Sequence, residues 1–367
     1  MKESQARIYL DYNASAPVLP EVAAAVEGVL RLPGNPSSIH RDGRRIRGLL
    51  DQSRDSVGNL VQARPEAITF TSGATEANTT VVMGLLSTGV VRRVLCSEIE
   101  HPSLLEHAQI VNRIKVGKNG IVDLAHLERE LKLSTGPVLV CVMFANNETG
   151  IIQPISDVCE ITHKYDGLVL CDAVQAPGKI KLNVEDTGAD FVTLSAHKIG
   201  GTQGVGALIN NSTIELGPIL IGGGQERKKR SGTENSSGIV GFGTAALSII
   251  AACGEENLTH LQERFETALL QADPDALIIG LDVPRLPNTT CLVKPGYPAE
   301  QQIINLDLAG FSVSAGSACS SGKVAKSHVL KAMGLGEDLA NSAIRVSFGH
   351  TTCWSDLEKF VSKWKSL

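Results

Sequence analysis

Short apolar runs alternate with helical stretches through the first 210 residues, and this alternation constrains the fold more than any other feature. Each run is rich in β-branched residues and has the length of a buried strand. Chains that alternate strands and helices in this way build a mainly parallel sheet with helices on its faces. The runs cover residues 67–73, 90–98, 136–144, 167–173, 189–197 and 204–209.

The C-terminal third has a different pattern. Residues 238–254 are small and apolar enough to form a long buried helix, and residues 258–271 have the spacing of an amphipathic helix. Short apolar runs and a last helix over 355–367 follow. We therefore predict an α/β fold in which a large domain, built on a mixed and mainly parallel sheet, is joined to a smaller α+β C-terminal domain. The predicted domains are residues 12–252, and residues 253–367 together with 1–11.

The charge balance and the cysteines exclude several classes of function. A net charge of −5 over 367 residues leaves no broad basic surface, so neither nucleic acid nor a membrane is expected as a partner. The basic run 225–230 is short, and we interpret it as a solvated loop. The first residues lack the apolar core of a secretion signal, so a cytoplasmic location is expected. The eight cysteines include no CxxC pair and none has zinc-ligand spacing, so no metal site is predicted.

Three positions follow the predicted strands, at the edge where ligands gather in parallel sheets. A helix starting at about Ala74 would turn free amide groups outward and bind phosphate, although ordinary capping explains the same residues. Asp172 ends an apolar run, where a buried carboxylate needs a cation, either a ring nitrogen of a cofactor or a structural arginine. Lys198 follows the next run and is either a surface lysine or an amine that holds an aldehyde.

These three positions gain weight when they are taken together. A phosphate-binding helix start, a strand-end aspartate and a strand-end lysine match three fixed points of pyridoxal 5′-phosphate. These points are its phosphate, its pyridinium nitrogen and its C4′ aldehyde. The combination therefore favours pyridoxal 5′-phosphate as cofactor.

Motifs along nearly the whole chain carry a resemblance to a known family. The sequence resembles the cysteine desulfurases of the NifS/IscS group, pyridoxal-phosphate enzymes of fold type I in the class V aminotransferase-like superfamily. The order and spacing of the motifs make the resemblance specific. They are YLDYNASAPVLPEV, FTSGATEANTTVV, EHPSLLE, NNETGIIQPI, CDAVQ, SAHKIGGTQGVGAL, RSGTEN, GSACSSG and AIRVSFG.

The resemblance implies a role for single residues around the cofactor. Lys198 is expected to hold the cofactor and to move protons, and Asp172 to keep the pyridine nitrogen protonated. His101 is expected to stack on the ring and to act in acid–base steps, and Gln175 to bind the phenolic oxygen. The expected phosphate contacts come from Ala74, Thr75, Ser195 and His197, with Thr233 reaching the phosphate of the partner subunit in a homodimer.

The resemblance also implies the substrate and the course of the reaction. Arg345 is expected to grip the α-carboxylate of L-cysteine, assisted by Asn147. The thiolate of Cys319 is expected to attack the substrate sulfur, so that L-alanine leaves and a persulfide stays on the enzyme. Sulfur then passes to an acceptor such as an iron–sulfur scaffold protein, whose cluster Cys319 would touch transiently, or a tRNA-thiolation carrier.

Two other classes of function use the same residues. Another pyridoxal-phosphate enzyme of fold type I, such as an aminotransferase or a selenocysteine lyase, would keep the cofactor pocket. A transaminase needs no mobile thiol, so Cys319 favours the desulfurase. A non-catalytic scaffold subunit would keep only the fold, and the presence of Lys198, Asp172, His101 and Cys319 together argues against it.

Overall fold

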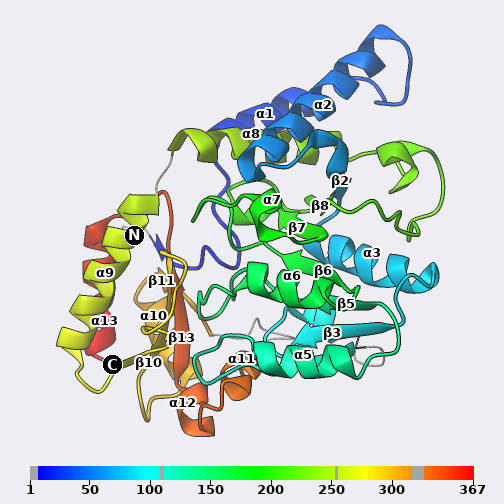
Figure 1. Ribbon diagram of the computed structural model, residues 1–367. Helices are drawn as coiled ribbons and strands as arrows, with labels where there is room; N and C mark the ends of the chain where they lie inside the picture. Colours follow the sequence, from blue (N-terminus) through cyan, green and yellow to red (C-terminus); the bar gives the residue numbers. More distant parts are fainter. Residues whose placement is uncertain (1–6, 108–110, 253–254, 316–325) are drawn as a thin grey trace.

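A seven-stranded sheet forms the centre of the molecule in the computed structural model, which describes residues 7–107, 111–252, 255–315 and 326–367 (Figure 1). Its strand order is β2-β8-β7-β6-β5-β3-β4. The strands from β7 to β4 are parallel, whereas β8 is antiparallel to both of its neighbours. The predicted mixed and mainly parallel sheet is therefore confirmed. The strands are β2 (Ile68–Thr71), β3 (Arg93–Ser97), β4 (Val111–Ile114), β5 (Val138–Cys141), β6 (Leu168–Asp172), β7 (Phe191–Ser195) and β8 (Gly206–Asn210).

Helices cover both faces of this sheet. Side chains alternate along each strand, so apolar strands present apolar side chains on both faces, and helices must cover each of them. Val138 and Val140 point into a core shared with one set of helices, whereas Leu139 and Cys141 point into a core on the other face. The first set is α1 (Pro20–Leu30), α2 (Arg41–Val61), α5 (Leu124–Lys132), α6 (Ile155–His163), α7 (Val184–Thr187) and α8 (Ser236–Ala252). The other face is covered by α3 (Ala74–Ser87) and α4 (Pro102–Leu105).

A second, smaller unit lies beside the large sheet (Figure 1). Its four strands are ordered β12-β13-β10-β9, and β1 pairs with β11 in parallel. Edge-to-face contacts of Phe265 with Phe348 and Phe360 fill its core, where Trp364 is also buried. The strands are β1 (Ile8–Tyr9), β9 (Leu277–Ile278), β10 (Thr289–Val293), β11 (Phe311–Ser312), β12 (Ser314–Ala315) and β13 (Ala343–Ser347). The helices are α9 (Glu255–Ala272), α10 (Ala299–Leu308), α11 (His328–Ala332), α12 (Glu337–Asn341) and α13 (Trp354–Lys365).

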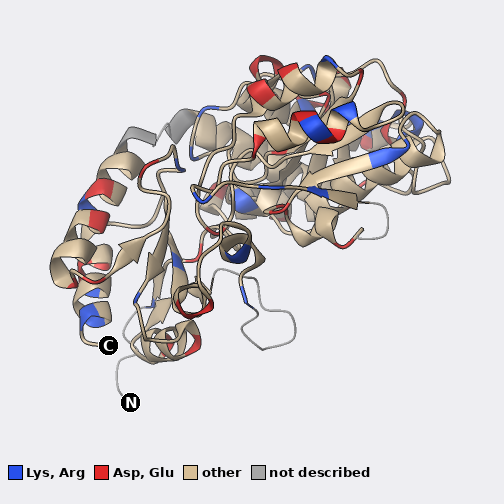
Figure 2. Cartoon of the chain, turned by 60° about the horizontal axis from the view of Figure 1, so that its bottom comes forward, with Lys and Arg blue, Asp and Glu red and all other residues tan. Residues whose placement is uncertain are grey.

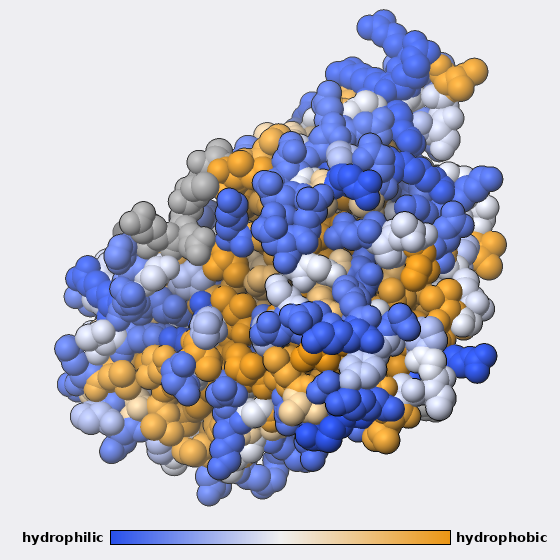
Figure 3. Space-filling view, viewed as in Figure 1, coloured by the Kyte–Doolittle hydropathy of each residue, from blue (hydrophilic) through white to orange (hydrophobic). Residues whose placement is uncertain are grey.

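A separate apolar cluster joins the two units. It brings Ile99 and Ile151, from the loops after β3 and β5, against Cys291, Leu330 and Met333 of the smaller unit. Hydrophobic side chains also gather in the middle of the face shown in Figure 3. The domain boundary predicted at residue 253 falls on residues 253–254, outside the described residues, and the division into two domains stays a prediction.

Two local expectations need correction. The last helix, expected over 355–367, runs from Trp354 to Lys365, and its capping box is formed by Cys353 and Asp356. The helix expected to be buried over 238–254 is α8, but Leu247 and Ile250 on its outer side are exposed. Its apolar sequence therefore covers the large core on one side only.

Charged residues of both signs are interspersed over the molecule (Figure 2). Many of them pair along a single helix, as Glu27 does with Arg31 and Glu128 does with Lys132. None of the described helices combines the length and the apolar character that a membrane span needs.

Candidate active site

The predicted site residues follow strands that end at the same edge of the large sheet. Strand β2 is antiparallel to β8, and β8 is antiparallel to β7, so β2 runs in the same direction as β7, β6, β5 and β3. The carboxyl ends of these five strands therefore meet at one edge. The residues that follow them there are Ala74, His101, Asn147, Asp172 and Lys198.

The start of α3 offers free amide groups at this edge. Its N-cap is Gly73, which provides no side chain to cap the first turn. A Cβ atom added to Gly73 would meet nothing within 4 Å, so open space adjoins the residue that precedes Ala74 and Thr75. Gly206 of β8 must be glycine, because a Cβ there would lie 2.7 Å from Gly73. This close approach holds the helix start against the sheet, in a position suited to a phosphate.

Ser195 and His197 reach the same edge from the end of β7. Ser195 is the last residue of the strand and is buried, while the ring Nδ1 of His197 lies 3.3 Å from the hydroxyl of Ser15. Burial and the neighbouring Lys198 charge lower the pKa of His197 to about 4. His197 is therefore a neutral hydrogen-bonding group at neutral pH.

Asp172 is a nearly buried carboxylate whose direct partners are neutral. It accepts hydrogen bonds from Asn78 Nδ2 at 3.0 Å and from the amide of Val174 at 3.1 Å. Asn78 is fixed in turn by the Thr193 hydroxyl, which donates to its Oδ1 at 2.8 Å. Asp172 forms no ion pair with any described residue. A buried carboxylate of this kind calls for a cation in front of it.

A chain of hydrogen bonds connects Asp172 to His101. Asn78, which donates to Asp172, also donates to Ser103 Oγ at 2.9 Å, and Ser103 Oγ lies 2.9 Å from His101 Nδ1. The amide of Ser103 donates to the same nitrogen at 3.1 Å, so Nδ1 is an acceptor and the proton of the neutral ring lies on Nε2. Burial lowers the pKa of His101; the charge of Asp172 opposes this shift and that of Lys198 adds to it.

Lys198 ends a short turn, Ala196–Lys198, that directly follows β7. Its Nζ donates to the main-chain oxygens of Asn13 at 2.6 Å and Ala14 at 2.9 Å. Burial and the positive charge of Arg345 lower the pKa of the Lys198 amine to about 8, although Asp172 opposes this shift. An amine with this pKa supplies a nucleophilic neutral form near neutral pH.

Asn13 joins several of the predicted residues, and the sequence analysis assigned it no role. Its main-chain oxygen accepts from Gln175 Nε2 at 3.0 Å as well as from Lys198. Its side chain donates to the main-chain oxygen of Asn147 at 3.2 Å and to Thr289 Oγ1 at 2.8 Å. Two signals could have pointed to it: its place in the motif YLDYNASAPVLPEV, and its position in a polar stretch after an apolar segment, the pattern that marked Asp172 and Lys198.

Arg345 enters the site from β13 of the smaller unit. Its Nη2 donates to Asp11 Oδ1 at 2.6 Å and its Nη1 to the main-chain oxygen of Asn147 at 2.9 Å. Its Nε is buried and has no hydrogen-bond partner among the described residues. The structure thus brings Arg345 and Asn147 together through the backbone of Asn147, not through its side-chain amide.

Two predicted residues lie less directly in this arrangement. Thr233 is exposed and lines a hollow of about 160 Å³ together with Ser72 and Arg230. Cys319 belongs to residues 316–325, outside the described residues. The chain enters that segment from β12, in which Ser314 pairs with Arg345.

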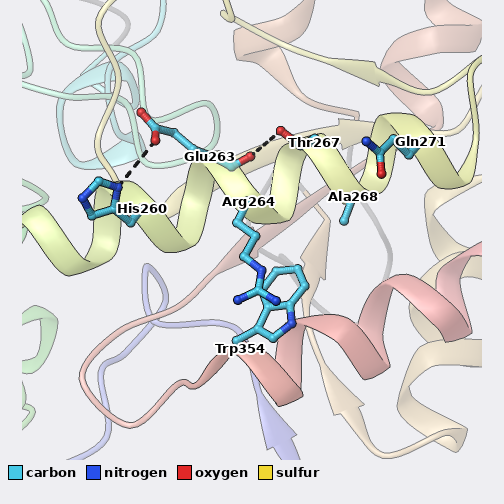
Figure 4. A pocket seen from close by; sticks show the side chains of 7 residues that line it. All are labelled: His260, Glu263, Arg264, Thr267, Ala268, Gln271 and Trp354. Atoms are coloured by element: carbon cyan, nitrogen blue, oxygen red, sulfur yellow. Dashed lines mark hydrogen bonds and ion pairs between the residues drawn. The ribbon is translucent and has the colours of Figure 1, made fainter.

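Another hollow, of about 380 Å³, lies on α9 and α13 (Figure 4). There the Arg264 guanidinium lies 3.7 Å from the ring centre of Trp354, and His260 faces Glu263. Its lining includes none of the predicted site residues. The described residues contain no cluster of His, Cys, Asp or Glu side chains suited to a metal ion.

Comparisons with known proteins agree with this arrangement. The chain matches the Aminotransferase class-V family over residues 8–360. It is 37% identical to a cysteine desulfurase IscS of Dictyoglomus turgidum, over 98% of this chain and 96% of the relative. It is 38% identical to a cysteine desulfurase of Cereibacter sphaeroides, over 97% and 94% of the two chains. The solved structure of a NifS-like protein from Rickettsia africae superposes with a TM-score of 0.91 at 37% identity, covering 98% and 99% of the chains.

Proposed function

The chain belongs to the class V aminotransferase family and, within it, to the cysteine desulfurases, and we propose that it removes sulfur from L-cysteine with the help of pyridoxal 5′-phosphate. One observation supports this most directly. Lys198, with its lowered pKa, and Asp172 follow neighbouring parallel strands, and Arg345 reaches the same place from the second unit. The amine suits the aldehyde of the cofactor and the carboxylate suits its ring nitrogen, while the guanidinium suits the carboxylate of an amino-acid substrate beside it.

Besides the amine of Lys198, the residues present fit pyridoxal 5′-phosphate at two separate points. The open space at Gly73, beside the helix start at Ala74 and Thr75, suits its phosphate, with Ser195 and His197 beside it. The buried carboxylate of Asp172, which lacks a cationic partner among the described residues, suits its protonated ring nitrogen. When bound, the cofactor supplies an electron sink for the bonds at the α-carbon of the substrate.

The chain's own groups then have distinct tasks. The neutral amine of Lys198 holds the cofactor and afterwards moves protons at the substrate carbon. Asp172 keeps the proton on the ring nitrogen, and the Asn78 amide keeps the carboxylate oriented. His101 would cover the cofactor ring when it is bound, and the proton on its Nε2 is the one that it could donate. Gln175 directs an amide N–H to the phenolic oxygen.

Arg345 holds the substrate carboxylate. Two of its nitrogens are occupied by Asp11 and by the Asn147 backbone, so the guanidinium is fixed in place before the substrate arrives. Its buried Nε lacks a partner among the described residues and is available for a carboxylate oxygen. The side-chain amide of Asn147 assists from the adjacent turn.

Cys319 accepts the sulfur. Its thiolate forms a bond to the substrate sulfur while the carbon–sulfur bond breaks, and the electron pair of that bond stays on the carbon side. The carbon takes up a proton and leaves as L-alanine, and the sulfur stays on the enzyme as a persulfide. The persulfide passes to an iron–sulfur scaffold or to a tRNA-thiolation carrier. We further propose that the enzyme works in the cytoplasm as a homodimer, in which Thr233 completes the phosphate site of the partner subunit.

The test measures both products from L-cysteine. The purified protein should form alanine, and mass spectrometry should find the additional sulfur on Cys319. Cys319→Ser should keep the yellow colour of the bound cofactor but release no sulfide. A transaminase would instead convert L-cysteine to its keto acid and be unaffected by Cys319→Ser, and that result would overturn the proposal.

A further inference from the structure

Lys179 is a second lysine beside Lys198, and the mechanism described above does not use it. Only 6% of its surface is exposed. Its Nζ donates to Asn13 Oδ1 at 3.0 Å and also to Gln175 Oε1. Lys179 forms no ion pair with any residue in the described part of the chain. A buried lysine that contacts only two amide oxygens is costly, so its position requires a reason.

The surroundings of Lys179 add to this cost. It lines a cavity of about 110 Å³ between the two units, together with Lys198, Tyr12 and Asn288. None of the residues that line the cavity is an aspartate or a glutamate. Burial lowers the pKa of Lys179 well below its ordinary value, and the charges of Lys198 and Arg345 act in the same direction.

We propose that Lys179 is a positioning residue that fixes the amide of Gln175 against the cofactor side of the site. This inference rests on the proposed function, since it concerns where Gln175 meets the cofactor. No direct contact with the cofactor or with the substrate is assigned to Lys179. It acts through the Gln175 amide, whose oxygen accepts its hydrogen bond.

The hydrogen-bond pattern leaves Gln175 a single amide orientation. The main-chain oxygen of Asn13 can only accept, so the nitrogen of the Gln175 amide must face it, at 3.0 Å. The amide oxygen then faces Lys179, which can donate whether its amine is charged or neutral. With both ends held, the second N–H of the amide has a fixed direction, and this is the group assigned to the phenolic oxygen.

Asn13 is held by the same lysine. Its Oδ1 accepts from Lys179 at 3.0 Å and from Asn288 Nδ2 at 3.2 Å, and its main-chain oxygen accepts from Lys198 at 2.6 Å. Lys179 therefore also fixes the residue that carries the acceptor for Lys198. Without Lys179, the Gln175 amide would lose the donor at its oxygen and could turn away from the cofactor.

The variant Lys179→Met removes the donor but keeps a long apolar side chain. The measurement is the pH midpoint of the visible absorption band of the Lys198-bound cofactor. Without the N–H of Gln175, the phenolic oxygen of the cofactor becomes more basic. It therefore holds more tightly the proton that it shares with the Lys198 nitrogen. We expect the midpoint to rise by about one pH unit, since a hydrogen bond to a charged group has about that value. Lys181→Met, at an exposed lysine two positions along, is the matched control and should leave the midpoint unchanged.

A double-variant comparison distinguishes positioning from a direct effect of the lysine charge. If Lys179 acts through Gln175, then Gln175→Leu and the double variant Gln175→Leu/Lys179→Met have the same midpoint. An additional shift in the double variant would overturn the inference, and so would an unchanged midpoint in Lys179→Met.

Two further comparisons keep the test decisive. If Lys179→Met does not fold, Lys179→Gln replaces it, because its amide keeps one donor; a smaller rise is expected, and no rise counts against the inference. If the wild-type protein binds no cofactor, the proposed function fails. If the wild type binds the cofactor normally and only the midpoint is insensitive to residue 179, this inference alone fails.

Discussion

Burial is the main reason for the lowered pKa of Lys198, and the ion pair between Asp11 and Arg345 adds two contributions of opposite direction. Arg345 lowers the pKa of the Lys198 amine, and Asp11 raises it. The pair is buried on the arginine side and its atoms are 2.6 Å apart. Removing the charge of one member also leaves the charge of the other unpaired. Both changes shift the pKa of Lys198 in the same direction, so their effects add. Arg345→Gln should therefore raise the pKa of Lys198, and Asp11→Asn should lower it.

The size of the effect follows from the pKa of about 8. At pH 7 roughly one tenth of an amine with this pKa is neutral, against about 3 in 10,000 at the ordinary value of 10.5. The environment of Lys198 thus increases the reactive fraction by about 300-fold. A change of one neighbouring charge shifts a pKa by about one unit, which means about a tenfold change in reactivity at pH 7.

The assay is competitive acetylation of the cofactor-free protein between pH 6 and 10, with the Lys198 peptide quantified by mass spectrometry. Because the folded pKa is lowered, the neutral amine is present above about pH 8 and is lost as the pH falls through that value. The wild-type labelling rate should therefore be half-maximal near pH 8. We expect the midpoint to move up in Arg345→Gln and down in Asp11→Asn.

The opposite signs make the result decisive. A general loosening of the site would move both midpoints in the same direction, towards the ordinary pKa of lysine. Arg285→Gln is the matched control, because it breaks a buried ion pair with Glu266 at 2.8 Å in the smaller unit. Its midpoint should equal that of the wild type. Equal shifts in both Asp11 and Arg345 variants would refute the electrostatic explanation of the Lys198 pKa.

Two more predictions concern the large unit. Asp172→Asn keeps the shape of the side chain but removes the charge assigned to the ring nitrogen. Alanine formation from L-cysteine should therefore fall at least about 100-fold, while the cofactor still binds. Turnover within a factor of about two of the wild type would exclude the assigned role. Arg54 and Glu226 form a buried ion pair at 2.7 Å, so changing either one to Met should lower the free energy of unfolding by about 3–5 kcal/mol. The double variant should lose less than the sum of the two single losses in urea denaturation, because neither charge is then left alone, and additive losses would contradict this.

The sequence was sufficient to predict the strand-end residues, and there is a physical reason for this. The ends of parallel strands meet at one edge, so Asp172 and Lys198 are brought together by the sheet itself, whatever the loops do. The glycine and the first helical residues after β2 could be recognised in the same way, because the start of a helix leaves its amides free. These predictions needed only periodicity and the direction of the strands.

The rest of the site depends on contacts between distant parts of the chain, which periodicity does not encode. Lys179 and Asn13 are 166 positions apart, and Arg345 and Asp11 are 334 positions apart. Lys179 follows a Pro-Gly turn and resembles an ordinary surface lysine until the fold places it beside Lys198. The role of Arg345 came from the resemblance to the family, since an arginine on a strand has no preferred function by itself.

The segment between β1 and α1 explains how two separately packed units form one site. Leu10 lies in the core of the smaller unit, whereas Leu19 lies in the core of the large one. Between them, Asp11 accepts a hydrogen bond from Arg345, and Asn13 accepts one at its main-chain oxygen from Lys198. Two positions of extended backbone span at most about 7 Å, so covalent geometry limits the separation between the partners of Arg345 and of Lys198 on this segment. The side chain of Asn13 also bonds Thr289 and Asn288 of the smaller unit, so this one segment connects the groups around Lys198 with those around Arg345.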